Sequence, residues 1–379
     1  MLSKKVIKIG VDITDLKFAK TGQKTFLESI CHEFDILNND KYIFHYFTYP
    51  FTNFESRNTL FILLNHLLFQ FWKQILLPIR MNWNKCDILF CADYYVPYFH
   101  IGFKSVQVIH DAFFLEYPTH YNKYWLYIYK ILSLSAARKS TFIITPTEYA
   151  KIKINQYTKI PLDRIIVISE GPKSFNKVQQ EVQLTETIKK ITEFKYILHV
   201  GVFEKRKNLL FLLKAFNLLI QSGHSDYKLV LVGKGTGRSE SDDTPNILNI
   251  ISDLELSKNI ILTGYVSDCE LAYIYKNANM YVFPSYNEGF GIPILEAFQF
   301  GLPVLVADNT CLPEVGGNGV ITFNPFNTQE LVRKMTTLIE DNKLRQQLIQ
   351  NGQERLKLYS WEKTAHALLP IFDKTSKTI

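Results

Sequence analysis

The sequence has few cysteines, and none of them is spaced for a metal or redox site. Its 379 residues include five: Cys31, Cys86, Cys91, Cys269 and Cys311. The number is odd, and no two cysteines are separated by two residues, which argues against a disulfide framework, a zinc site and a redox pair. We therefore expect a protein of the reducing cytoplasm.

Long uninterrupted apolar segments are also missing. The N-terminus leads directly into a short strand expected at 6–11, without the apolar core of a signal peptide. The longest hydrophobic stretch, 60–79, contains five polar residues: Asn65, His66, Gln70, Lys73 and Gln74. It predicts an amphipathic helix instead of a membrane span. We expect its apolar face to pack on a core; the alternative is peripheral contact of Phe69, Trp72 and Leu76 with the inner membrane face.

Sequence motifs for metal ions and for nucleotide-binding P-loops are absent. Residues 233–237 are rich in glycine but lack the Gly-Lys-Ser/Thr ending of a P-loop. Asp242 and Asp243 lie in a polar loop, and no Asp-x-Asp follows a predicted strand. We expect no metal ion and no other cofactor.

The composition is that of an ordinary folded protein, with 47% hydrophobic and 21% charged residues, and the length allows two domains. Residues 1–172 hold 20 Lys and Arg against 14 Asp and Glu, so most of the net charge of +7 lies there. This excess suggests an anionic partner, such as a lipid-phosphate acceptor or an acidic membrane face. A solvated surface without a partner is the alternative, and no nucleic-acid-binding module accompanies the charge.

Strands and helices are expected to alternate in two successive runs. The first run has six expected strands, at 6–11, 42–47, 88–91, 106–109, 142–145 and 165–168. The second run has strands expected at 196–201, 228–232, 259–262, 280–283 and 304–307, with helices at 208–222, 247–256, 268–277 and 293–300. Such alternation predicts an α/β fold with parallel sheets covered by helices on both faces.

One segment places a glutamate on each side of a glycine-containing turn. Residues 280–283 predict a buried strand, and 293–300 predict a helix that follows it closely. Ligands bind at the carboxyl ends of strands in open α/β sheets, and a helix N-terminus favours phosphate. Glu288 would then lie beside a sugar carried on that phosphate, and Glu296 would reach a ribose hydroxyl. An ordinary turn between two unrelated glutamates is the alternative.

Several short blocks occur together with this segment and in a fixed order. They are Gly201-Val202-Phe203-Glu204-Lys205-Arg206-Lys207-Asn208, Leu262-Thr263-Gly264-Tyr265-Val266-Ser267-Asp268, Pro284-Ser285-Tyr286-Asn287-Glu288-Gly289-Phe290-Gly291, Glu296-Ala297, Gly301-Leu302-Pro303-Val304 and Leu312-Pro313-Glu314-Val315. As a set they resemble the signature of the retaining glycosyltransferases of the GT-B type, often called group 1 or family four. The resemblance continues more faintly through the N-terminal half.

The resemblance implies two Rossmann-like, doubly wound domains that face each other across a cleft. The N-terminal, acceptor-binding domain would span 1–172, and the C-terminal, donor-binding domain would span 194–358. A linker at 173–193 would join them, and a last helix within 359–379 would cross back onto the first domain.

The same resemblance implies a metal-independent enzyme. It would move a sugar, with retention of anomeric configuration, from a UDP- or GDP-sugar to a glycan or lipid-linked acceptor. Rival interpretations on this fold are a nucleotide-sugar epimerase, a phosphorylase, and a sugar-nucleotide-binding protein without catalysis.

Two adjacent cations are the expected phosphate clamp. Arg206 and Lys207 follow a predicted strand, where a guanidinium fork and an ammonium can hold a diphosphate. Taken without the resemblance, such a run is more often a solvated turn. The family often has a further basic residue just after Gly201, where this chain has Val202 and Phe203.

The resemblance also implies roles for residues on other loops. His110, at the end of the strand expected at 106–109, would lie beside the donor sugar, although a structural histidine at a strand end is the alternative. Gly22, in 21–24, matches a family loop near the acceptor and phosphates, and a plain turn fits equally well. The remaining donor-binding positions are Gly233, Val266, Gly289, Phe290, Gly291 and Ile292.

Overall fold

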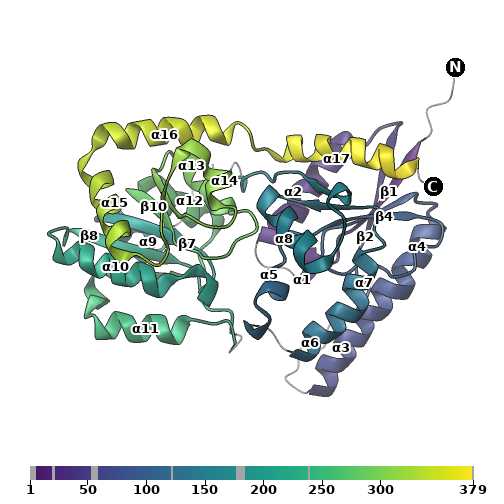
Figure 1. Ribbon diagram of the computed structural model, residues 1–379, viewed down its shortest axis with the longest axis horizontal. Helices are drawn as coiled ribbons and strands as arrows, with labels where there is room; N and C mark the ends of the chain where they lie inside the picture. Colours follow the sequence, from purple (N-terminus) through teal and green to yellow (C-terminus); the bar gives the residue numbers. More distant parts are fainter. Residues whose placement is uncertain are drawn as a thin grey trace. The chain divides into compact units, whose positions relative to one another are not determined.

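The computed structural model describes residues 6–18, 22–52, 59–120, 123–175, 184–237 and 240–377 (Figure 1). The chain divides into two compact units. Unit 1 takes its described residues from 1–118, 122–171 and 360–379, and unit 2 takes them from 119–121 and 172–359. Each unit has one parallel six-stranded sheet, so the predicted α/β class with parallel sheets is confirmed.

The sheet of unit 1 has the strand order β2-β1-β3-β4-β5-β6, and all of its pairs are parallel. Its strands are β1 Ile7–Asp12, β2 Tyr42–Phe47, β3 Ile88–Cys91, β4 Lys104–Val108, β5 Phe142–Thr145 and β6 Ile165–Val167. The six strands predicted for the first run are therefore all present. The chain adds β2 on one side of β1 and β3 on the other, so the topological switch point lies between β1 and β3.

Helices surround this sheet, and the last of them comes from the C-terminal end of the chain. They are α1 Asp15–Phe18, α2 Gly22–Leu37, α3 Thr59–Phe71, α4 Leu77–Trp83, α5 Phe113–Glu116, α6 Lys123–Ile128, α7 Leu134–Ala137, α8 Glu148–Thr158 and α17 Trp361–Ser376. Two π-helical turns, η1 Trp72–Leu76 and η3 Tyr129–Ser133, join neighbouring helices. The ring of Phe372 in α17 lies about 6 Å from the rings of Phe34 and Phe90, which fixes α17 in the core of unit 1.

The sheet of unit 2 has the order β12-β11-β10-β7-β8-β9, with its switch point between β7 and β10. The strands are β7 Lys195–Val200, β8 Tyr227–Val232, β9 Ile260–Gly264, β10 Met280–Phe283, β11 Val304–Ala307 and β12 Val320–Phe323. The sequence pattern did not predict β12. It is a four-residue edge strand with only its first and last residues buried, and so short an apolar run does not by itself distinguish a strand from other structure.

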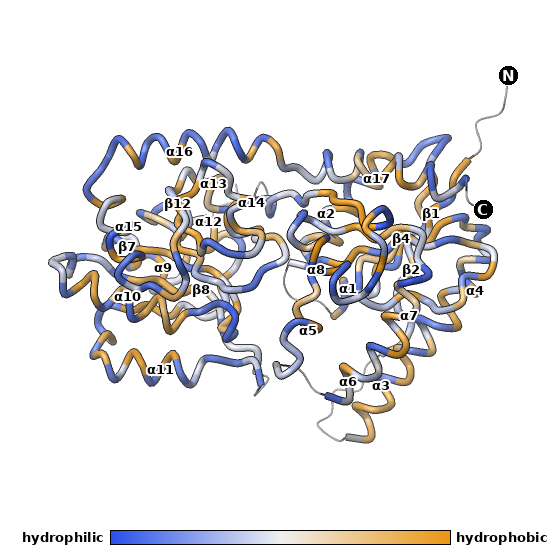
Figure 2. The backbone as a smooth tube through the Cα atoms, viewed as in Figure 1, coloured by the Kyte–Doolittle hydropathy of each residue, from blue (hydrophilic) through white to orange (hydrophobic). Residues whose placement is uncertain are grey.

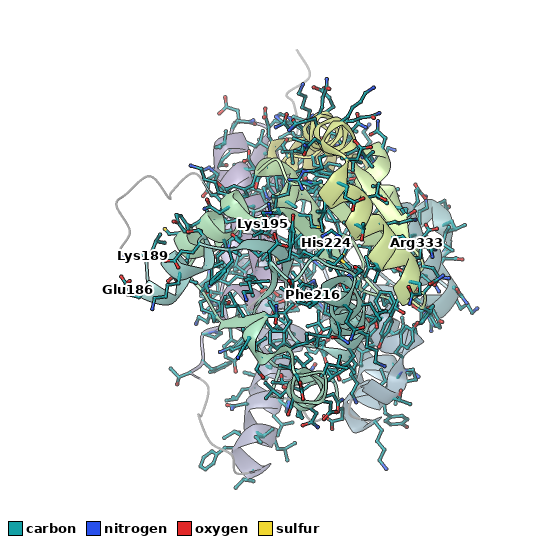
Figure 3. The ribbon with its side chains drawn as sticks, turned by 90° about the vertical axis from the view of Figure 1, so that its left-hand side faces the viewer. Glu186, Lys189, Lys195, Phe216, His224 and Arg333 are labelled. Atoms are coloured by element: carbon teal, nitrogen blue, oxygen red, sulfur yellow. The ribbon has the colours of Figure 1, made fainter. Side chains whose placement is uncertain are left out.

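The helices of unit 2 are α9 Glu186–Ile191, α10 Leu209–Gln221, α11 Thr244–Asp253, α12 Asp268–Asn277, α13 Ile292–Gln299, α14 Leu312–Gly316, α15 Thr328–Glu340 and α16 Asn342–Leu356. Figure 3 shows Phe216 of α10 inside the unit, whereas Glu186 and Lys189 of α9 lie toward its outside. Within the stretch predicted as a linker, 173–193, residues 176–183 lie outside the described residues.

The helix over Leu60–Trp83 corrects one prediction. We expected its apolar face to be buried, yet only 17% of its most apolar window is buried, and Leu67 is 58% exposed. Trp72, expected at a bilayer in the alternative, is instead fully buried. A hydrogen bond explains why Trp72 is buried. Trp72 Nε1 donates to Thr14 Oγ1 at 2.9 Å, so this side of the helix faces the sheet.

A buried ion cluster fixes the same helix to the switch point of unit 1. Lys73 has no exposed surface, and its Nζ pairs with Asp12 Oδ2 at 2.5 Å and with Asp93. Asp12 ends β1, and Asp93 follows β3 by two residues. Burial raises the pKa of Asp93 to about 7. Burial alone would lower the pKa of Lys73, but the charges of Asp12 and Asp93 outweigh it and raise the pKa of Lys73.

Candidate active site

Three of the predicted site residues meet at the switch point of unit 2. Arg206 and Lys207 follow β7, and Glu288 follows β10, which lies beside β7 in the sheet. Glu288 Oε2 accepts from Arg206 Nη1 at 2.8 Å, and Glu288 Oε1 accepts from Lys207 Nζ at 2.6 Å. The structure therefore brings the expected phosphate clamp and the expected sugar-binding carboxylate into direct contact.

Backbone contacts hold the two loops together. The cations lie on a 3-10 turn, η6 Lys205–Lys207, which Asn208 ends in the left-handed conformation, with φ of 58°. The side-chain amide of Asn208 donates through Nδ2 to Pro284 O at 3.2 Å, and the backbone amide of Tyr286 donates to Arg206 O at 3.0 Å. These bonds fix where Arg206 and Lys207 stand relative to Glu288.

The electrostatics of the cluster keep its carboxylate ionised. Burial opposes the charge on Glu288, but Arg206 and Lys207 outweigh it and lower the pKa to about 2. Burial lowers the pKa of Lys207, although Glu288 acts in the opposite direction. Arg206 Nε also pairs with Glu204 Oε2 at 2.7 Å. Two cations thus stand close together, and two carboxylates offset their charge.

The loop after Glu288 opens α13 through a glycine with positive φ. Gly291 has φ of 103° and is the N-cap of α13, whose second residue is Pro293. Cys311 Sγ donates to Glu288 O at 3.3 Å and to Phe290 O at 3.2 Å, and these contacts hold the loop in place. The first-turn amides of α13, including that of Ile292, begin directly after this loop, as an anion-binding helix N-terminus requires.

Glu296 lies inside α13 and is buried. Its Oε2 accepts from Tyr275 Oη of α12 at 2.8 Å. Burial raises the pKa of Glu296, with the Tyr275 hydrogen bond acting in the opposite direction. Glu288 thus precedes α13 and contacts two cations, whereas Glu296 lies within α13 and contacts Tyr275.

Two further predicted positions lie at the ends of neighbouring strands. Gly233 directly follows β8 with φ of 135°, and a side chain there would collide with Gly201 O. Its amide donates to Gly264 O at 3.0 Å, close in sequence to the buried Val266. Glycine at 233 is therefore required by a close backbone approach, whether or not a nucleotide contacts it.

A buried histidine behind the cluster was missed by sequence analysis. His199 in β7 has its Nδ1 3.0 Å from Val282 O, and its Nε2 has no hydrogen-bond partner among the described residues. Burial lowers its pKa to about 4, so the ring is neutral at pH 7. A Cβ on Gly201 would lie 3.4 Å from His199 Nε2 and 3.8 Å from Lys207 Nζ. Gly201 therefore lies in van der Waals range of both side chains at the end of β7.

The predicted residues of unit 1 lie at the carboxyl end of its sheet. His110 follows β4, and its Nδ1 is 2.7 Å from Glu170 Oε1, a partner that sequence analysis did not identify. Although burial opposes it, Glu170 raises the pKa of His110. His110 Nε2 has no hydrogen-bond partner among the described residues. Gly22 is the first residue of α2, and Thr21 of the predicted loop lies outside the described residues.

No group of three or more His, Cys, Asp or Glu side chains that could hold a metal ion occurs within the described ranges. Asp242 instead accepts from the amides of Gly237 and Thr244 at 2.8 and 2.9 Å, which orders its loop.

Comparison with known proteins identifies relatives. The family model described as glycosyl transferases group 1 matches residues 183–355. O-antigen chain mannosyltransferase B of Escherichia coli is 30% identical over 305 residues, which cover 76% of this chain and 76% of that protein. The serotype-specific mannosyltransferase WbdA of Escherichia coli is 28% identical over 287 residues, covering 74% of this chain but only 34% of that longer protein.

Solved structures share the fold. Sucrose-phosphate synthase from Thermosynechococcus elongatus superposes with a TM-score of 0.74 at 16% identity, covering 98% of this chain and 100% of that one. The Anabaena protein HepE, solved with UDP and glucose, gives 0.70 at 17% identity, covering 97% and 100%. The predicted GT-B fold, with two Rossmann-like domains, is confirmed.

Proposed function

Because the chain belongs to the group 1 glycosyltransferases, we propose that it transfers a hexose from a nucleotide-sugar to a growing polysaccharide, with retention of configuration. The observation that carries the proposal is the contact of Glu288 with Arg206 and Lys207 at the switch point of unit 2. A diphosphate leaving group needs cations, and the sugar next to it needs a carboxylate or other polar groups.

In the proposed reaction, Arg206 and Lys207 bind the diphosphate and stabilise the negative charge that develops on it as the bond to the anomeric carbon breaks. The acceptor hydroxyl forms the new bond to that carbon from the face that the leaving diphosphate occupies. The proton of the hydroxyl passes to the departing phosphate oxygen. Two protein cations supply the neutralisation, so the reaction requires no metal ion. Glu288, already ionised, binds the sugar hydroxyls.

We also assign His110 to the donor sugar, as the family resemblance implies. Glu170 holds His110 through Nδ1, which leaves Nε2 as the group available to a donor-sugar hydroxyl. We assign Gly22, Gly233, Val266 and the loop amides of 289–292 to the donor and phosphates, as the family resemblance implies.

The relatives favour mannose as the transferred sugar, since two of them are named mannosyltransferases. The test includes both UDP- and GDP-sugars. The solved neighbour HepE, which was crystallised with UDP, is the reason to include UDP-sugars. A thermal-shift screen of nucleotide-sugars, followed by mass spectrometry with glycan and lipid-linked acceptors, identifies the pair. A donor that stabilises the protein and is consumed only with an acceptor supports the proposal. We place the reaction in the cytoplasm, in agreement with five free cysteines.

The rival functions make different demands. An epimerase would convert the donor without any acceptor, a phosphorylase would need free phosphate, and a binding protein would hold the donor without turnover. Any of these results would overturn the transferase proposal.

Lys207→Ala should weaken nucleoside diphosphate binding by about 1.5–3 kcal/mol, because it removes a charge-assisted contact to the phosphates. Lys205→Ala is the matched control: Lys205 lies on the same turn, but its Nζ donates to Glu240 O at 2.9 Å. Calorimetry with UDP and GDP measures both variants. Equal affinities of the wild type and Lys207→Ala would contradict the phosphate assignment.

Glu296→Ala should weaken binding of a nucleoside diphosphate while leaving inorganic pyrophosphate binding unchanged, because we assign Glu296 to the ribose. Tyr275→Phe controls for the hydrogen bond that Glu296 accepts, since it removes the phenol and keeps the carboxylate. Competition calorimetry with both ligands separates the ribose from the phosphates. A Glu296→Ala variant with wild-type nucleotide affinity would remove Glu296 from the site.

A further inference from the structure

One face of the helix over Leu60–Trp83 carries an apolar stripe. Its members follow one another at intervals of four residues, and each is between 42% and 83% exposed: Leu63, Leu67, Phe71, Ile75, Ile79 and Trp83. Four-residue steps drift around an α-helix of 3.6 residues per turn, but the wider π turn Trp72–Leu76 offsets that drift in the middle of the stripe. Figure 2 shows the apolar character of α3 over most of its length. A continuous exposed apolar stripe of this length marks an interaction surface.

The stripe cannot turn inward without breaking the core. Trp72 and Lys73, on the opposite side of the helix, are bound to Thr14, Asp12 and Asp93. The helix meets the length and composition of a membrane span, but its buried lysine ties it into unit 1. The stripe therefore lies along a surface and does not cross a membrane.

A second exposed apolar group lies near the stripe. Tyr127, Ile131 and Leu132 are 66%, 49% and 41% exposed on α6 and η3. The ring of Tyr95 connects the two helical segments, since it lies 5.4 Å from Phe69 and 6.0 Å from Tyr129.

The charged side chains within these two helical segments all have one sign. Neither 59–85 nor 123–139 contains an aspartate or glutamate. The exposed cations of these segments include four that we call the basic rim: Arg80, Lys85, Lys130 and Lys139. Apolar side chains flanked by cations and free of carboxylates are complementary to an anionic lipid surface.

We propose that the apolar stripe and the basic rim dock unit 1 onto a bilayer containing anionic lipid. The apolar side chains enter the headgroup and acyl boundary, and the cations stay at the phosphates. Because the same helix anchors the switch point of unit 1 through Lys73, docking fixes that sheet edge relative to the lipid surface. The inference does not depend on the proposed transfer reaction.

Co-sedimentation with vesicles tests the surface. The full chain should bind vesicles of phosphatidylcholine mixed with phosphatidylglycerol more tightly than phosphatidylcholine alone, and less tightly as salt rises. Leu67→Gln/Ile75→Gln should lower partitioning by about tenfold or more. Ile36→Gln/Ile152→Gln is the matched control, because these isoleucines are 65% and 59% exposed on α2 and α8, away from the stripe. The control should bind as the wild type does.

Charge reversal and fluorescence give independent readouts. Lys130→Glu/Lys139→Glu should abolish the preference for anionic vesicles, whereas Lys276→Glu/Lys343→Glu, with the same change in net charge, should not. Trp83, 83% exposed, should shift its emission to shorter wavelength on anionic vesicles, and Trp83→Phe should lose that shift. Absence of wild-type binding to anionic vesicles at low salt would overturn the proposal. So would a dimer that Leu67→Gln/Ile75→Gln dissociates, since a second copy would then cover the stripe.

Discussion

Glu288→Gln is expected to lower turnover by about 10²–10³-fold, the scale seen when one preorganised electrostatic contact is removed from an active site. Glu288 is buried and ionised, with a pKa of about 2, and it contacts both cations of the clamp. The neutral amide keeps the size of the side chain but loses its charge toward the transferring sugar. An interaction tied to the reacting sugar is expressed in the rate.

Binding of a bare nucleoside diphosphate should not weaken in Glu288→Gln. Glu288 neutralises part of the charge of Arg206 and Lys207, so its removal should leave diphosphate affinity unchanged or make it tighter. Glu204→Gln is the matched control, because Glu204 pairs with Arg206 Nε at 2.7 Å but is not assigned to the transferring sugar. Steady-state kinetics and calorimetry on both variants measure the two effects. Normal turnover in Glu288→Gln would refute the sugar assignment.

Lys73→Met should destabilise unit 1 by about 3–5 kcal/mol, because it leaves the carboxylates of Asp12 and Asp93 buried without their cation. All four tryptophans, Trp72, Trp83, Trp125 and Trp361, belong to unit 1, so tryptophan fluorescence follows the unfolding of this unit in urea. The exposed Lys343, changed to Met, should alter stability by no more than about 0.5 kcal/mol.

A rescue variant separates charge from packing. Asp12→Asn/Lys73→Met/Asp93→Asn removes all three charges and should recover part of the stability lost in Lys73→Met. A Lys73→Met protein as stable as the wild type would show that the cluster does not hold the helix against the sheet.

Local sequence predicted that Arg206, Lys207 and Glu288 lie at the carboxyl ends of strands. Arg206 and Lys207 come after β7, Glu288 comes after β10, and carboxyl ends of adjacent parallel strands meet at one edge. What sequence analysis could not give was the direct contact between these charges. That contact depends on the strand order, which places β10 beside β7 although the strands β8 and β9 and the helices α10, α11 and α12 separate them in the chain.

The contacts that were missed join residues far apart in sequence. Lys73 is 61 residues from Asp12 and 20 from Asp93, and His110 is 60 residues from Glu170. The exposed face of the helix over Leu60–Trp83 was mispredicted for a related reason. A hydropathy pattern predicts that Lys73 lies on the surface. In the structure Lys73 pairs with two buried aspartates, so the side of the helix that carries it is buried.

Proton NMR of the reaction of the wild-type chain with the donor and acceptor found by screening tests the proposed transfer most directly. We expect one new glycosidic bond whose anomeric configuration equals that of the donor, with one nucleoside diphosphate released for each bond formed. Donor that is bound but not consumed, donor altered without an acceptor, or a product of inverted configuration would contradict it.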